Sequence, residues 1–352
     1  MRASISEVEF GKLDDGSVIK KFLLRNSHGT EACFLNLGAS WIGFKRQQDS
    51  QSLVLGCDDA QTFAHQHAFL GSTVGRWANR IGHGQAQLNG ERIQVEVNLP
   101  PHHLHGGSHG FSFKLWESRI ELVNDATPTL TFSHFSPDGE GGFPGNLQTT
   151  VKITLTDDDT VRFDYHASTD ASTILNLTNH AYFNLNGETT GSLRDHEFKL
   201  ASHEYLEADD DALPTGRVLN SDGTVLDFAN WTDAFTKLTP LCDEQLIRAG
   251  GIDHCFCYPD DQQLKILAQA RHAGSNTQLT CRSTLPGMQF YTGNFLGGTP
   301  KSADIRFATH GAFCFEPGYW PDSPNHDHFP DCRISPEKDF SAIIEYSFDS
   351  ME

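Results

Sequence analysis

Long apolar runs and basic residues are both scarce in this sequence. No segment reaches the roughly 18 to 20 apolar residues that cross a bilayer, and the N-terminal MRASISEVEFGKL has no basic stretch followed by an apolar run. The 26 Lys and Arg are outnumbered by 46 Asp and Glu, which gives a formal net charge of −20. Binding to nucleic acid requires clustered cations, so this acidic balance disfavours it. We expect a cytoplasmic protein with no membrane partner and no nucleic-acid partner.

Signatures of disulfide frameworks, metal sites and nucleotide sites are also missing. The eight cysteines are dispersed and form no CxxC pair, so we expect reduced, mostly buried thiols. The glycine-rich segment 139–145 (GEGGFPG) lacks the Lys-Ser/Thr of a phosphate-binding loop. No metal site is expected, because no carboxylate or further histidine stands at the usual ligand spacing from any of three histidine groups: His65 and His67; His102, His103 and His105; His326 and His328.

The residues that are abundant favour short strands joined by turns. The 352 residues include 25 Phe, 31 Gly and 15 Pro. Apolar residues alternate over 151–155 and again over 161–165, on either side of Asp157-Asp158-Asp159, which predicts a hairpin. A second hairpin is predicted over 85–97, where Asn89-Gly90 supplies the positive φ angles of a tight turn.

Strand patterns recur along the whole chain, whereas helical periodicity is confined to residues 58–67 and 230–235. Such short helices cannot supply the crossovers of a parallel sheet. No linker or repeat marks a boundary, so the chain is predicted to be all-β, a large antiparallel β-sandwich in one domain over residues 1–352. The further predicted strands are 18–25, 31–36, 129–134, 173–178, 264–270, 277–283, 288–291, 312–315 and 340–348.

Three titratable residues have unusual surroundings. Asp253 and Glu316 are flanked by apolar and aromatic residues, and partial burial of a carboxylate is more common at functional sites than elsewhere. His180 stands in the segment NLTNHAYFN, where a buried, hydrogen-bonded structural histidine is an equally good interpretation.

Eight segments in one order along the chain carry a resemblance to a known family. They are GRWANRI at 75–81, LHGG at 104–107, SPDGEGGFPGNL at 136–147, NLTNHAYFNLNG at 176–187, LPTG at 213–216, GIDHCF at 251–256, QFYTGNFLGG at 289–298 and PDSPN at 321–325. Together they resemble the aldose 1-epimerase family, often called galactose mutarotases, over nearly the whole chain.

The resemblance implies a galactose mutarotase-like supersandwich whose open face holds a sugar pocket and no cofactor. By motif position, the pocket residues are Arg80, His105, His180, Asp253 and Glu316, with Asn79, Tyr182 and Gln289 as further sugar contacts. The pair Pro317-Gly318 stands where many members carry polar residues, which bears on sugar preference more than on chemistry.

Exchange of anomers requires one base and one acid, with no metal or nucleophile. We expect Glu316 to take the proton of the C1 hydroxyl and His180 to protonate the ring oxygen of a free aldohexose such as galactose or glucose. Arg80 and Asp253 would orient hydroxyls, and His105 would assist at the ring oxygen or bond a hydroxyl. The alternatives are a hexose-6-phosphate 1-epimerase, a glycoside hydrolase that uses Asp253 with Glu316, or a non-catalytic sugar-binding sandwich. The chain is expected to act as a monomer or homodimer.

Overall fold

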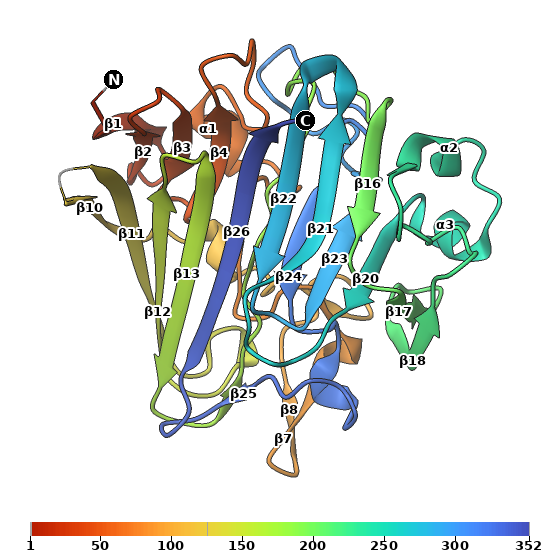
Figure 1. Ribbon diagram of the computed structural model, residues 1–352. Coiled ribbons are helices and arrows are strands. Elements are labelled where there is room, and N and C mark those ends of the chain that lie inside the picture. Colours follow the sequence, from red (N-terminus) through yellow and green to blue (C-terminus); the bar gives the residue numbers. More distant parts are fainter. Residues whose placement is uncertain (1, 125, 352) are drawn as a thin grey trace.

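The computed structural model describes residues 2–124 and 126–351, and antiparallel strands dominate it (Figure 1). This confirms the predicted all-β class. The largest sheet has nine strands in the order β10-β11-β12-β13-β26-β22-β21-β16-β19. Its strands are β10 Glu117–Val123, β11 Thr127–Ser136, β12 Leu147–Leu155, β13 Thr160–Thr169, β26 Phe340–Ser350, β22 Thr277–Ser283, β21 Lys265–His272, β16 His196–Leu200 and β19 Thr232–Asp233.

Two smaller sheets complete the main layers. A five-stranded sheet has the order β18-β17-β20-β23-β24, and a four-stranded sheet has the order β1-β2-β3-β4. The five strands are β17 Glu204–Ala208, β18 Pro214–Asn220, β20 Asp253–Cys257, β23 Gly287–Tyr291 and β24 Cys314–Gly318. The four are β1 Ser4–Lys12, β2 Val18–Arg25, β3 Glu31–Leu35 and β4 Ser40–Lys45.

One hydrophobic core joins the three sheets. Phe34 of β3, Phe163 of β13 and Phe290 of β23 belong to the same cluster of buried side chains. In Figure 1 the nine-stranded sheet lies in front, with β23 and β24 behind it and β1–β4 beside them. The large sheet therefore packs one face against both smaller sheets, which is the predicted sandwich.

Four two-stranded pairings connect the loops that surround the sheets. They are β5 Thr73–Val74 with β15 Thr178–Asn179, β6 Arg80–Ile81 with β9 His103–Leu104, β7 Gln85–Leu88 with β8 Glu91–Gln94, and β14 Thr173–Ile174 with β25 Arg333–Ile334. The three α-helices in the described ranges are α1 Ala60–Ala64, α2 Ala234–Leu238 and α3 Glu244–Ala249, and none is long and apolar enough to cross a membrane.

Both predicted hairpins are present. Strands β12 and β13 pair in register from Leu147↔Thr169 to Leu155↔Val161. Strands β7 and β8 pair around Asn89 and Gly90, both of which have positive φ, as a tight two-residue turn requires. The eight cysteines are free, and all but Cys33 and Cys242 are buried, as expected.

Two predicted elements are wrong in part. The strand expected over 173–178 is divided into β14 and β15, because between them the backbone of Asn176 bonds Arg76 O and Ala78 N instead of continuing either ladder. The helix expected over 230–235 begins only at Ala234, since Asp233 still pairs with β16 and its carboxylate caps the N–H of Phe235.

Candidate active site

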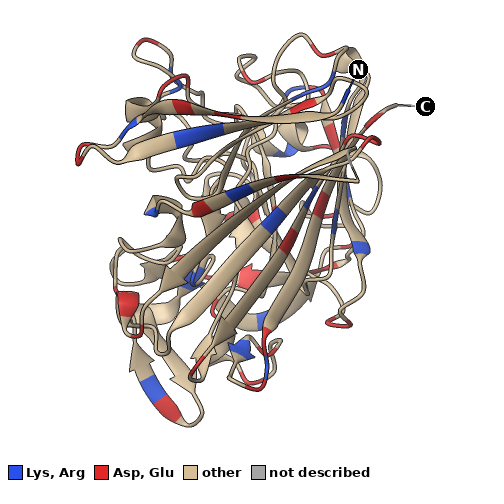
Figure 2. Ribbon diagram, turned by 90° about the vertical axis from the view of Figure 1, so that its left-hand side faces the viewer, with Lys and Arg blue, Asp and Glu red and all other residues tan. Residues whose placement is uncertain are grey.

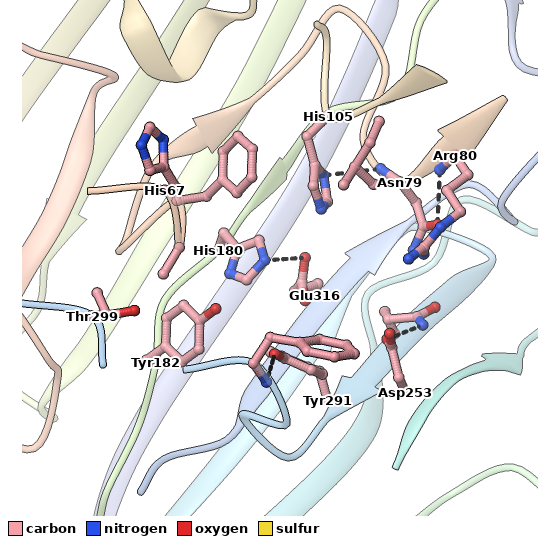
Figure 3. Close-up of a pocket in the computed structure, with 15 residues that line it drawn as sticks. His67, Asn79, Arg80, His105, His180, Tyr182, Asp253, Tyr291, Thr299 and Glu316 are labelled. Carbon is pink, nitrogen blue, oxygen red and sulfur yellow. Dashed lines mark hydrogen bonds and ion pairs between the residues drawn. The ribbon is translucent and has the colours of Figure 1, made fainter. Parts of the chain in front are cut away.

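All eight residues selected from the sequence line one pocket of about 230 Å³ (Figure 3). The pocket lies on the face of β20, β23 and β24 that points away from the core. The eight are Asn79, Arg80, His105, His180, Tyr182, Asp253, Gln289 and Glu316, and they come from segments more than 230 residues apart in the chain.

The sheet register explains why the pocket floor is polar. Gln289 of β23 pairs with Glu316 of β24 on one side and with Cys255 of β20 on the other. Because side chains alternate across a strand, Gln289 and Glu316 share one face, and Asp253, two residues from Cys255, shares it too. The intervening residues Phe256, Met288, Phe290 and Phe315 are buried in the core on the opposite face.

Glu316 and His180 form a close pair at the centre of the pocket. His180 Nε2 lies 3.6 Å from Glu316 Oε2, and both side chains are only 6% exposed. His180 follows β15, and its backbone is held between Ser72 O and Gly71 N. Burial raises the pKa of Glu316 well above its ordinary value, with nearby Asp253 adding to the effect, while burial lowers the pKa of His180 to about 4.

The pair Glu316 and His180 has two states of equal net charge. In one state Glu316 is ionised and His180 is protonated, and in the other both are neutral. The states differ by the position of a single proton. Mutual attraction stabilises the first state and burial stabilises the second, so the two are brought closer in free energy than they would be in water.

His105 is fixed as a neutral hydrogen-bond donor. Asn79 N donates to His105 Nδ1 at 3.1 Å, which places the remaining ring proton on Nε2. Burial lowers the pKa of His105 well below its ordinary value, and His180 and Arg80 add to this effect. Asn79 and His105 both have left-handed φ angles, of 67° and 52°, a backbone strain that is common at functional sites. The ring centroids of His105 and His180 are 5.4 Å apart.

Arg80 and Gln289 each have a buried polar atom that is free to bond a ligand. Gln289 Nε2 donates to Asp253 Oδ1 at 2.6 Å, which orients both side chains. Among the described residues, Gln289 Oε1 and Arg80 Nε are buried without a hydrogen-bond partner. A buried polar atom left unpaired is costly, so these two atoms are suited to bonding a ligand's hydroxyls.

Aromatic side chains line much of the rest of the pocket. Tyr182 stacks on His180 with ring centroids 5.0 Å apart, and Phe69 stacks on the same ring at 6.1 Å. Seven further lining residues were not predicted to contact a sugar: His67, Ala68, Phe69, Leu104, Tyr291, Phe295 and Thr299. Leu104 lies in the LHGG motif, and Tyr291 and Phe295 lie in the QFYTGNFLGG motif, which was the available signal for these three.

One group of side chains in the described ranges is close enough together to hold a metal ion. It consists of His180, Cys314 and Glu316, with one ligand atom from each within 4.8 Å of the others. Cys314 Sγ lies 3.7 Å from His180 Nδ1, on the opposite side of the ring from Glu316. None of the three histidine groups noted in the sequence belongs to this cluster.

The family is decided by sequence comparison. A family model described as aldose 1-epimerase matches residues 20–347. The chain belongs to the aldose 1-epimerase family. The aldose 1-epimerase of Escherichia coli K12 is 34% identical over 340 residues, 95% of this chain and 96% of that protein. The galactose mutarotase of Bos taurus is 34% identical over 350 residues, 98% of each chain. The chain is therefore an isomerase, and the hydrolase and non-catalytic alternatives are not favoured.

Solved structures of similar proteins support the fold of this aldose 1-epimerase family member. A galactose 1-epimerase from Lactobacillus acidophilus superposes with a TM-score of 0.88 at 24% identity, over 99% of this chain and all of that one. An aldose epimerase homologue from C. elegans gives a TM-score of 0.83 at 26% identity, with the same coverage. The predicted galactose mutarotase-like fold is thus confirmed.

Proposed function

We propose that this protein interconverts the α and β anomers of free aldohexoses such as galactose and glucose, with Glu316 and His180 as the proton-transfer pair. The observation that carries this proposal is the buried pair itself, 3.6 Å apart at the centre of the pocket. The C1 hydroxyl oxygen and the ring oxygen of a pyranose are bonded to the same carbon. Two proton-transfer groups this close together can both reach oxygens that share one carbon.

The reaction moves one proton onto the pair and another off it. Ionised Glu316 takes the proton of the C1 hydroxyl while protonated His180 gives its proton to the ring oxygen, and the C1–O5 bond breaks. The pair is then in its neutral state, beside an open-chain aldehyde. Rotation about C1–C2 presents the other face of the carbonyl, and reversal of both transfers closes the ring as the other anomer.

The remaining polar groups orient the sugar. Arg80 offers charge-assisted donors to neighbouring hydroxyls, and Asp253 offers an acceptor that Gln289 holds in place. Asn79 positions both His105 and Arg80. Its backbone N–H donates to His105 Nδ1, and its side-chain oxygen accepts from Arg80 N at 2.8 Å. His105 Nε2–H is a donor for the oxygen on C1, and Tyr182 forms a wall beside His180.

We propose neutral sugars over hexose 6-phosphates. Arg80 is the single Arg or Lys among the described residues that line the pocket. In Figure 2 Lys and Arg are scattered over the ribbons among Asp and Glu. A dianionic phosphate would gain little from such surroundings. The kcat/KM for galactose or glucose should exceed that for glucose 6-phosphate, and the reverse ranking would overturn the preference.

Polarimetry tests the activity directly. Freshly dissolved α-D-galactose should reach its equilibrium rotation faster with the protein than without it, at a rate proportional to protein concentration. A hydrolase would instead release sugar from a glycoside, and a binding module would leave the rotation rate unchanged.

No metal is needed for these proton transfers, so anomer exchange should survive treatment with EDTA. Loss on chelation with recovery on adding Zn²⁺ would assign a metal to His180, Cys314 and Glu316.

We also propose that residues 1–352 act as one domain, supported by a core cluster that includes residues from Phe22 to Phe348. A cytoplasmic location is supported by eight free cysteines, since disulfides are rare in that compartment. A monomer or homodimer is proposed as the working form.

A further inference from the structure

We propose a second activity for the same pocket, the hydrolysis of aldono-1,5-lactones to aldonic acids, with Glu316 as base, His180 as acid and His105 as donor to the carbonyl oxygen. The inference rests on the proposed function. It extends that function from a sugar whose C1 is a hemiacetal to one whose C1 is an ester carbon.

Anomer exchange sets a requirement on the space around C1. An enzyme that interconverts anomers must accept the C1 oxygen in both the α and the β position. When water adds to a lactone, the tetrahedral intermediate carries oxygens in both positions at once and is otherwise the same pyranose. A pocket that accommodates each anomer therefore has room for both oxygens of this intermediate, and the walls that bind the other hydroxyls are unchanged.

The same bond breaks in both reactions. Anomer exchange cleaves C1–O5 with proton donation to O5, and breakdown of the lactone's tetrahedral intermediate cleaves this bond with the same donation. His180 and Glu316 are 3.6 Å apart and reach two oxygens on one carbon in either reaction. No protein nucleophile is required, because water attacks and the carboxylate of Glu316 acts as general base.

The protons and electrons balance with water as the only co-reactant. Water attacks C1, Glu316 takes one of its protons, and the carbonyl π pair becomes an alkoxide on the C1 oxygen. The alkoxide re-forms the carbonyl, the C1–O5 bonding pair leaves with O5, and His180 donates a proton to O5. The product is the open-chain aldonic acid. The proton on Glu316 then passes to His180, which restores the starting pair.

Lactone hydrolysis needs a donor for the alkoxide, a charge that anomer exchange does not generate. His105 is neutral, and its Nδ1 is occupied by the Asn79 N–H, so Nε2–H is free to donate. The His105 side chain lines the pocket, and its ring centroid lies 5.4 Å from that of His180. A donor fixed before the reaction stabilises a developing oxyanion without reorganisation.

The test follows acid release from D-glucono-1,5-lactone at constant pH, with anomer exchange of glucose measured on the same preparation. The wild-type protein should release acid faster than the uncatalysed reaction, in proportion to its concentration, and glucose should compete. Glu316→Gln should lower both rates by roughly 10² or more. The matched control is Glu121→Gln on exposed strand β10, which should change neither rate.

His105→Asn separates the lactone reaction from anomer exchange. Asn tolerates the left-handed backbone at this position, but its shorter side chain withdraws the donor. Loss of an oxyanion donor typically costs roughly 10²- to 10³-fold, so lactone kcat should fall by that factor and anomer-exchange kcat by less. Equal losses in the two reactions would overturn the assignment of His105.

The outcomes distinguish the two proposals. Anomer exchange without lactone hydrolysis, including a lactone that only inhibits, overturns the second activity and leaves the first. Absence of both rejects the proposed function as well. Lactone hydrolysis that survives Glu316→Gln would place the activity outside this pocket and contradict the inference.

Discussion

Gln289 and Phe290 are neighbours in β23, yet they lie on opposite faces of one sheet. Phe290 is fully buried and packs on Phe198, Phe228 and Phe315, whereas Gln289 reaches the pocket and bonds Asp253. The same alternation separates Phe315 from Glu316 in β24. Packing on the core face fixes the positions of the strands, and this in turn fixes the polar side chains that the same strands present to the pocket. Stability and chemistry should therefore respond to different residues of the same strand.

The largest expected effect is on the pocket face, at the proton-transfer pair. His180→Asn should lower kcat by roughly 10² to 10⁴, the usual contribution of one acid–base group, with little change in substrate affinity. In the double variant with Glu316→Gln the loss should be smaller than the product of the two single losses, because both groups serve one proton circuit. Anomer exchange measured by NMR at saturating sugar provides each kcat. If the loss of kcat in the double variant equalled the product of the two single losses, Glu316 and His180 would not act in one proton circuit.

The matched pair Phe290→Ala and Gln289→Ala tests the division between faces. Phe290→Ala removes a buried ring and should lower the free energy of unfolding by about 3–5 kcal/mol. Gln289→Ala should change stability far less but raise KM, since it releases Asp253. Urea denaturation and steady-state kinetics on both variants provide the comparison. Similar stability losses would show that the two faces are not separable.

Arg76 and Arg80 extend the comparison to the GRWANRI motif. Arg76 is buried and makes five hydrogen bonds, to Ser136 Oγ and to four backbone carbonyls, so Arg76→Ala should destabilise the fold. Arg80→Ala should weaken kcat/KM by roughly 10- to 100-fold, the worth of one charge-assisted bond, partly through KM. Thermal unfolding and steady-state kinetics on both variants provide the measurement. A stable Arg76→Ala with impaired kinetics, beside a destabilised Arg80→Ala, would contradict this assignment.

Strand alternation was predictable from the sequence, and apolar surroundings marked His180, Asp253 and Glu316 as candidates. Asn79 and His105 were selected only through the family resemblance, because nothing in their local sequence indicates a pocket. Phe69 and Thr299 were not predictable, because they reach the pocket from loops whose paths depend on contacts distant in sequence. The division of the strand at 173–178 was not predictable for a similar reason, since the backbone partners of Asn176 are Arg76 and Ala78, about 100 positions away in the sequence.

The smallest expected effect is a change in how stability depends on pH. The folded pKa of Glu316 lies above its unfolded value, so above the ordinary glutamate range the folded state binds more protons and stability falls as pH rises. Glu316→Gln removes this cost. The variant should therefore gain stability relative to wild type as pH rises above the ordinary glutamate range, measured by urea denaturation. A difference between the two proteins that stayed constant with pH would show that Glu316 is not shifted in this direction.

Histidines buried in the fold should act in the opposite direction. Burial lowers the pKa of His180, His196 and His254 to about 4, so the folded state binds fewer protons than the unfolded chain below pH 6.5. Stability should be lost as pH falls from about 6.5 to about 4.

The central claim is that Glu316 is the base that opens the ring. The most direct measurement is anomer exchange by NMR under saturating galactose for Glu316→Gln, a variant that keeps the shape and hydrogen-bonding reach of the side chain. If Glu316 is the base, kcat should fall by roughly 10² to 10⁴, with KM nearly unchanged and the fold intact by circular dichroism. A kcat near that of the wild-type protein in a fully folded variant would contradict this claim and make Asp253 the first candidate for the base.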